Sequence, residues 1–255
     1  MESIDPATVK YKTNYITRVI LRIDFSPILP LRDDLDPEFQ DVARRKMPEF
    51  SVQSAQEFTA QFNRTGSSQS TTALNQYVFS TKNKHRKLTI GYPFLIVEVR
   101  DYHDFDDFMH LVDHIIPPFQ RTYEPIAVNR LGLRYVNEIV RSKGSPYDWH
   151  GIISEDLTSL LSTPFADENH TARIMSQIVY NYGDYRTNFT FGISNSEFPS
   201  RITRREFVLD FDTYTKEAEL SDYRKLLTDF NAAMVTLFEH SIGDQLRDEM
   251  RGGEH

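Results

Sequence analysis

Four arginines stand in two strand-like segments of the same design. They are Arg18, Arg22, Arg130 and Arg134. Residues 18–22 read Arg-Val-Ile-Leu-Arg, and residues 130–134 read Arg-Leu-Gly-Leu-Arg. Because side chains alternate between the two faces of a strand, both arginines of a segment point away from the apolar residues that would enter a core. Guanidinium groups bind carboxylates and phosphates through paired hydrogen bonds, so four of them around an approximate twofold axis would hold an anion.

The second segment carries further features that suit a binding site. Gly132 has no side chain, which would let a ligand or another backbone approach closely. Tyr135 and Asn137 follow on the same predicted strand. The predicted ligand-binding residues are therefore Arg18, Arg22, Arg130, Gly132, Arg134, Tyr135 and Asn137.

Acidic residues on matching strands offer these arginines partners within the protein itself. They are Asp24, Glu98, Glu138, Asp210 and Asp212. Opposite charges on neighbouring strands commonly form ion pairs. The number of such acids favours a structural role for the arginines, and an anion or nucleotide site is the alternative.

Two other groups of residues could in principle do chemistry. His110 and His114 have the one-turn spacing of two metal ligands on a helix, but the apolar stripe of that helix faces the other way and no His-Glu-x-x-His motif is present. Trp149 and His150 stand at a predicted helix start with Asp148 as N-cap, where a lone Trp is typical of a core anchor. We expect no metal, no cofactor and no catalytic residue.

The elements that position these residues follow from the apolar periodicity. The first half predicts a strand over 15–25, a helix from an Asp36 cap to about residue 45, strands over 74–81, 87–92 and 94–100, and a helix over 104–120. Residues 82–85 predict a hairpin turn, and the polar stretch 63–70 predicts a mobile loop. Pro117 and Pro118 are expected to end or bend the second helix.

The second half repeats this order. It predicts a strand over 127–140, a helix over 148–161, strands over 173–182, 185–194 and 204–214, and a long helix over 221–250. We therefore predict an α+β fold of internally duplicated β-α-β-β-β-α units, with largely antiparallel sheets related by a pseudo-twofold. The repeats would span 1–125 and 126–255 and form one compact structural unit.

Composition limits the classes of function. The chain has 255 residues, no cysteine and a formal charge of −8. The absence of cysteine excludes disulfides, thiol nucleophiles and zinc ribbons. A negative surface disfavours nucleic acid as a partner. With no apolar run long enough for a membrane span and no signal peptide, we expect a cytoplasmic protein.

Residues 130–139 read Arg-Leu-Gly-Leu-Arg-Tyr-Val-Asn-Glu-Ile. This stretch resembles the central R-x-G-L-R-Y-[IV]-N-x-I motif of a sporadically distributed family of uncharacterised bacterial and archaeal proteins of about this length. Residues 20–25, the pair Asp148 and Trp149, and residues 209–212 match further shared features, so the resemblance covers nearly the whole chain. It implies no activity for any residue, and the patchy distribution implies an accessory component, mobile or associated with defence.

The functional expectation is a binding protein. Its ligand would be a partner protein or a small anionic ligand in the groove between the two sheets. The alternative is a metal-independent enzyme that processes RNA or nucleotides with a nearby histidine. A third interpretation is a structural subunit that forms a homodimer through the late helix.

Overall fold

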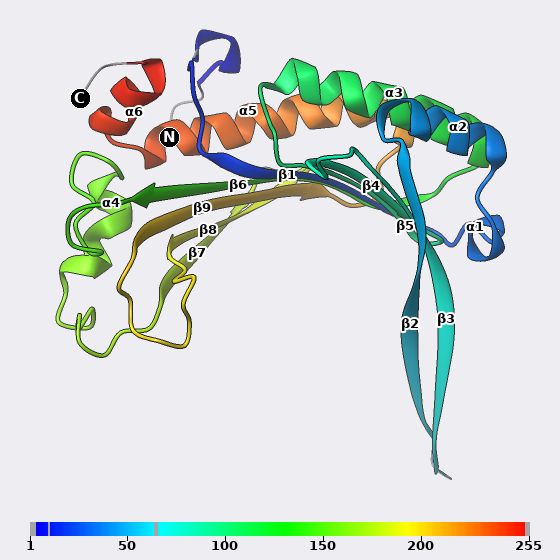
Figure 1. The fold of residues 1–255 in the computed structure, drawn as a ribbon, viewed down its shortest axis with the longest axis horizontal. Coiled ribbons are helices and arrows are strands. Elements are labelled where there is room, and N and C mark those ends of the chain that lie inside the picture. Colours follow the sequence, from blue (N-terminus) through cyan, green and yellow to red (C-terminus); the bar gives the residue numbers. More distant parts are fainter. Residues whose placement is uncertain (1–3, 10, 64–65, 253–255) are drawn as a thin grey trace. The chain divides into compact units, whose positions relative to one another are not determined.

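The computed structural model of the protein describes residues 4–9, 11–63 and 66–252, with side chains outside 55–73 (Figure 1). It is a mixed helical and sheet structure, which confirms the α+β class. Its strands form an antiparallel sheet in the order β2-β3-β4-β5-β1-β6-β9-β8-β7. The chain divides into two compact units. Unit 1 comprises Met1–Val19, Gly132–Thr215 and Arg224–His255, and unit 2 comprises Ile20–Leu131 and Lys216–Tyr223. No described helix is long and apolar enough to cross a membrane.

Unit 2 contains the elements of the first half of the chain. They are β1 (Ile16–Phe25, which begins in unit 1), α1 (Pro30–Asp33), α2 (Pro37–Lys46), β2 (Glu49–Asn63), β3 (Gly66–Ser80), β4 (Arg86–Gly91), β5 (Phe94–Val99) and α3 (Phe105–Tyr123). The expected antiparallel meander of β3, β4 and β5 is confirmed by the register, in which Leu88 faces both Phe79 and Val97.

Local sequence accounts for the two longer helices of unit 2. The Asp36 carboxylate accepts the N–H of Phe39 at 2.8 Å, and the Asp104 carboxylate accepts the N–H of Asp107 at 2.8 Å, so each caps the donors that a helix start leaves unpaired. Both helices lie over the same face of the sheet (Figure 1). The Phe119 ring on α3 lies 5.6 Å from the Phe25 ring on β1, which ties helix to sheet.

The structure differs from the expectations for this half in three places. Strand β2 was not predicted, because residues 49–63 lack a continuous apolar alternation and gain their regularity by pairing with β3 from Glu49–Ser80 to Asn63–Gly66. Residues 66–70 of the predicted loop belong to β3, while residues 64 and 65 lie outside the described residues. Helix α3 continues past Pro117 and Pro118, since the buried rings of Phe119 and Tyr123 hold its last turn.

Unit 1 contains the remaining elements. They are β6 (Val128–Arg141, which begins in unit 2), α4 (Glu155–Thr158), β7 (Ile174–Asn181), β8 (Arg186–Ile193), β9 (Arg205–Thr215), α5 (Tyr223–Ser241, whose first residue is in unit 2) and α6 (Asp244–Arg251), with short 3-10 turns at Pro6–Thr8 and Ser159–Ser162; a third such turn, Leu220–Asp222, belongs to unit 2. Helix α5 lies along one face of the strands (Figure 1). On that face the Phe189 and Phe211 rings stack at 4.6 Å, and the Tyr185 ring meets Phe230 of α5 at 5.3 Å.

Two helix predictions in this half are also wrong. The expected helix over 148–161 is a loop followed by the single turn α4, and Ser154, not Asp148, takes the N-cap position. The expected long helix over 221–250 is divided into α5 and α6 at Gly243, whose N–H donates to the Ile152 carbonyl at 2.8 Å. A Cβ at Gly243 would collide with the Gly151 carbonyl, so this close approach requires glycine.

The unit boundaries fall inside β1 and β6, whereas the sequence prediction divides the chain at residue 125. The N-terminal segment belongs to unit 1 because its side chains contact late helices. The Tyr11 hydroxyl donates to the buried Glu239 carboxylate of α5 at 2.6 Å. Burial, together with this carboxylate, raises the pKa of Tyr11.

Candidate functional site

Two of the four candidate arginines pair with acids on the helix-free face of their strands. Arg22 of β1 contacts Asp24 at 2.8 Å. Arg134 of β6 makes two bonds to Asp210 of β9, from Nε at 2.8 Å and from Nη2 at 2.5 Å. The hydrogen bonds that Asp210 accepts raise the pKa of the Arg134 guanidinium. Both pairings involve acids that the structural interpretation named.

The other two arginines, Arg18 and Arg130, are half-buried on the same strands. Arg18 and Arg134 belong to unit 1, and Arg22 and Arg130 belong to unit 2. The four guanidinium groups are thus divided between the units, and their meeting around a twofold stays a prediction.

The remaining predicted site residues are buried. Tyr135 and Asn137 lie on the face of β6 opposite Arg134, because strand side chains alternate. The Tyr135 hydroxyl donates to Asn231 of α5 at 3.0 Å, and the Asn137 amide donates to the Leu209 carbonyl of β9 at 3.2 Å. These bonds hold β6 to its helix and its neighbouring strand. Gly132 is buried as well.

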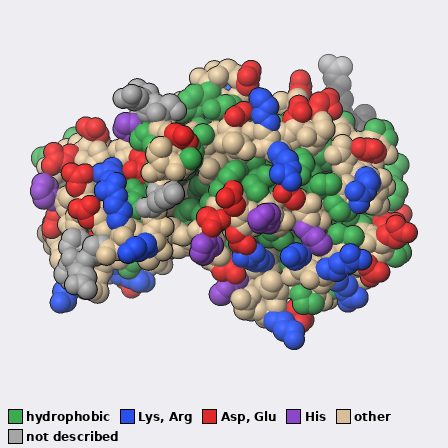
Figure 2. Space-filling view, turned by 90° about the horizontal axis from the view of Figure 1, so that it is seen from above, with side chains coloured by type: hydrophobic (Ala, Val, Ile, Leu, Met, Phe, Trp, Pro, Cys, Tyr) green, Lys and Arg blue, Asp and Glu red, His purple; other side chains and the backbone are tan. Residues whose placement is uncertain are grey.

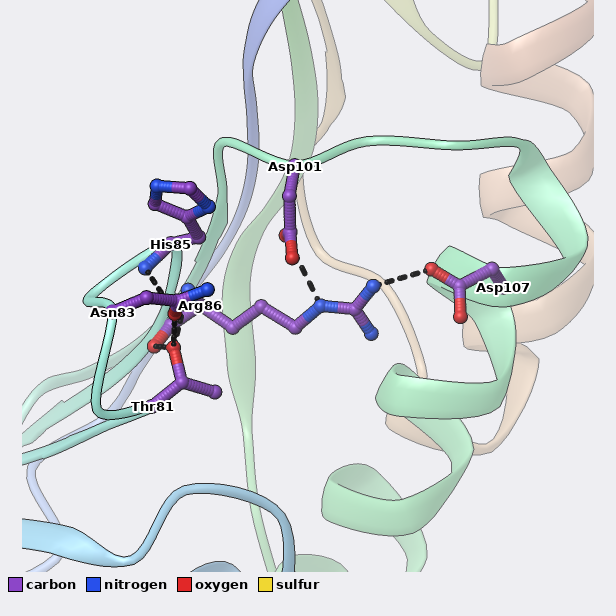
Figure 3. A network of polar contacts seen from close by, with 6 residues as sticks. All are labelled: Thr81, Asn83, His85, Arg86, Asp101 and Asp107. Atoms are coloured by element: carbon purple, nitrogen blue, oxygen red, sulfur yellow. Dashed lines mark hydrogen bonds and ion pairs between the residues drawn. The ribbon is translucent and has the colours of Figure 1, made fainter.

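A polar network surrounds the β3–β4 turn of unit 2 (Figure 3). The Arg86 guanidinium contacts Asp101 at 3.1 Å and Asp107 of α3 at 2.7 Å, and the Thr81 hydroxyl donates to Asn83 at 2.6 Å. The network closes the turn and leaves the Arg86 charge neutralised. Its role is structural.

Two of the candidate histidines lie on α3, whereas Trp149 and the third lie in the loop before α4. The His114 ring lies 2.8 Å from the Val42 carbonyl of α2, so it joins two helices. Within the described residues, no group of three or more His, Cys, Asp or Glu side chains is arranged to hold a metal ion. Trp149 is 1% exposed and donates to the Pro146 carbonyl, as expected of a core anchor, whereas His150 is exposed beside Glu155.

The face seen in Figure 2 interleaves basic, acidic and histidine side chains.

Unit 1 contains a pocket of about 440 Å³ on the helix-free side of its strands. Its lining residues are Glu138 and Val140 of β6, Arg173 before β7, Ser194, Asn195, Ser196 and Phe198 after β8, and Glu206, Phe207 and Val208 of β9. Asn195 shapes one wall: it adopts a left-handed backbone with φ of 56°, and its amide donates to the carbonyls of Ala172 and Ser200. These two bonds hold the loop that follows β8 against the segment that precedes β7 and against the loop's own later residues.

Arg173 is oriented by two contacts in this pocket. Its Nε donates to the Ser194 carbonyl at 2.8 Å, and its guanidinium lies 4.1 Å from the centre of the Phe198 ring. Arg173 was not among the predicted site residues. Neither periodicity nor a motif marks it in the sequence, because its contacts come from a loop that lies up to 25 positions later.

Strand β7 ends the strand order and has only β8 beside it. Among the described residues, none of its backbone groups bonds to a segment other than β8. Its sequence, Ile-Met-Ser-Gln-Ile-Val-Tyr-Asn, contains no charge and no proline. Ile178 and Val179 are 39% and 57% exposed. The sequence shows that this strand carries no charge, but it does not show that the strand lies at the edge of the sheet.

Comparisons with known proteins give no match, neither to a family model nor to a curated protein.

Proposed function

We propose that this protein acts by binding a partner protein, and that an extended segment of the partner pairs with the free edge of β7. The observation that carries the proposal is an eight-residue edge strand without any of the usual protection against pairing. Edge strands are normally blunted by charges, proline, bulges or a covering segment, because their unpaired backbone groups recruit other strands. An added strand is a common mode of peptide recognition.

The geometry of the turn after β7 indicates which backbone groups are available. The Tyr182 N–H donates to the Tyr185 carbonyl across this turn at 3.0 Å. In an antiparallel pair, groups that bond to the neighbour alternate with groups that point away. Ile178 therefore bonds toward β8, and the N–H groups of Gln177 and Val179 point outward to a partner.

The side chains of β7 suit an apolar partner segment. Val179 and Ile178 expose apolar surface on opposite faces of the strand, and the exposed Tyr182 lies at its end. Because the strand is uncharged, the partner strand is expected to be uncharged and rich in β-branched or aromatic residues.

The test uses a proline at an outward-pointing N–H. Peptides selected from a random library on the wild-type protein are titrated against Val179→Pro and Val179→Thr by fluorescence polarisation. Val179→Pro removes a donor to the partner but none to β8, so we expect its affinity to fall about tenfold or more, while Val179→Thr stays within about twofold.

Equal affinity of the selected peptides for Val179→Pro and the wild type would contradict the proposal, provided that both unfold at the same denaturant concentration. Light scattering of the wild type identifies the case in which the bound strand comes from a second copy. At pH 7.5, where the net negative charge opposes association, a concentration-dependent mass that Val179→Pro abolishes would make this chain its own partner and overturn the assignment to another protein.

We also infer that the two halves of the chain arose by duplication. The order β1-α2-β3-β4-β5-α3 parallels β6-α4-β7-β8-β9-α5, with α1 and β2 as additions to the first half and α6 as an addition to the second. The strand order supports this inference, because β3-β4-β5-β1 is followed by its counterpart β6-β9-β8-β7 in reverse.

A further inference from the structure

We propose that the pocket of unit 1 binds a small zwitterion with an apolar side chain, the chemical class of apolar amino acids and dipeptides. The site is separate from the outward groups of β7 and does not depend on the partner-binding proposal. Its volume of about 440 Å³ lies within the range of small-molecule sites.

Arg173 supplies the contact for the ligand's carboxylate. The Nε of its guanidinium already donates a hydrogen bond to the Ser194 carbonyl, and the plane of the guanidinium packs on the Phe198 ring. Neither Nη atom has an acceptor among the described residues. A planar pair of N–H donors held in one orientation is the arrangement that binds a carboxylate through two hydrogen bonds.

The two acids of the pocket differ in their availability. Glu206 is 7% exposed and already accepts the N–H and the hydroxyl of Ser196, with Arg204 at 3.8 Å. Glu138 is exposed, and its carboxylate has no partner in the described part of the chain. Glu138 is therefore the group that would receive a ligand's ammonium.

This charge pattern decides between ligand classes. A purely anionic ligand would gain from Arg173 but meet the unpaired negative charge of Glu138, which costs energy at close range. A zwitterion satisfies both groups. Val140, Phe198, Phe207 and Val208 supply apolar surface for its side chain, and the first two are 47% and 52% exposed.

A set of four probes separates the two charged contacts. Isothermal titration calorimetry is run with L-phenylalanine, L-leucyl-L-phenylalanine, 3-phenylpropanoate, which lacks the amine, and 2-phenylethylamine, which lacks the carboxylate. We expect both zwitterions to bind saturably and each one-charge analogue to bind about tenfold or more weakly, the loss of a charged hydrogen bond.

Variants of the two residues should then act on different probes. Arg173→Gln is expected to weaken phenylalanine and phenylpropanoate but not phenylethylamine. Glu138→Gln is expected to weaken phenylalanine and phenylethylamine but not phenylpropanoate. Arg186 is an exposed arginine outside the pocket, so Arg186→Gln is the matched control and should leave the affinity for all four probes unchanged.

Absence of saturable heat with both zwitterions would overturn the proposal, as would phenylalanine affinity unchanged by both pocket variants. Should Arg173→Gln lower the unfolding midpoint, Glu138→Gln alone carries the test, since its exposed carboxylate holds no contact that folding needs. Val179→Pro is expected to bind phenylalanine normally, so a failure of the edge proposal and a failure of the pocket proposal give different results.

Discussion

Arginine has three different uses in this protein, although the residues look alike in the sequence. Arg134 forms a two-bond pair with Asp210, and Arg86 joins two acids at a turn. Arg173 donates its Nε–H to the Ser194 carbonyl, which leaves its Nη donors for the proposed ligand. The neighbours that the fold supplies, rather than the residue type, separate a structural guanidinium from a binding one.

The Arg134–Asp210 pair is expected to stabilise unit 1. Its side chains are 45% and 15% exposed, and its geometry is bidentate. Arg134→Ala should lower the free energy of unfolding by about 1 kcal/mol, the upper part of the range for such pairs. Urea denaturation of Arg134→Ala, Asp210→Ala and the double variant measures the coupling. Strictly additive losses would show that the pair contributes nothing to stability.

The starts of α2 and α3 were predictable at the level of elements. Asp36 and Asp104 stand directly before helices and use their side chains as N-caps, a relation confined to four residues of chain. The strands of the meander were predictable for the same local reason. The short α4 and the break at Gly243 were not, because they depend on contacts between residues about 90 positions apart, such as the bridge between Ile153 and Ile242.

The cap of α3 should make stability depend on acid. The N–H of Asp107, followed by His103, lowers the pKa of Asp104. A lowered carboxyl pKa gives stability above the unfolded pKa, which is lost as the pH falls through the folded value. Asp104→Ala should therefore cost about 1 kcal/mol at pH 7 and less once the pH has fallen through the lowered pKa of Asp104. Asp104→Asn, which caps without titrating, is the control. A cost for Asp104→Ala that does not change with pH in urea denaturation would contradict this account.

The chain as a whole carries a formal charge of −8, with a pI near 5.5. Repulsion between copies at neutral pH opposes association, whereas near the pI that repulsion vanishes. The uncharged edge of β7 then has no electrostatic protection. The charge that disfavours nucleic acid as a partner also limits self-association.

Lowering the pH from 7.5 to 5.5 should increase the mass measured by light scattering, and Val179→Lys should reduce this increase because an edge lysine opposes strand pairing. Leu160→Lys changes the net charge equally at an exposed site outside the sheet, and serves as the matched control. Equal suppression by both variants would assign the effect to net charge rather than to the edge.

The sequence by itself determined the α+β class, the meander, the capped start of α2 and the direction in which Arg22 and Arg134 point, because periodicity and capping act over a few residues. It also contained the acids that pair with them. Only the tertiary structure decided which strand lies at an edge, which groups Tyr135 and Asn137 bond to, and that Arg173 stacks on Phe198 in a pocket that Glu138 also lines. These depend on distant segments brought together by folding, and no local pattern encodes their meeting.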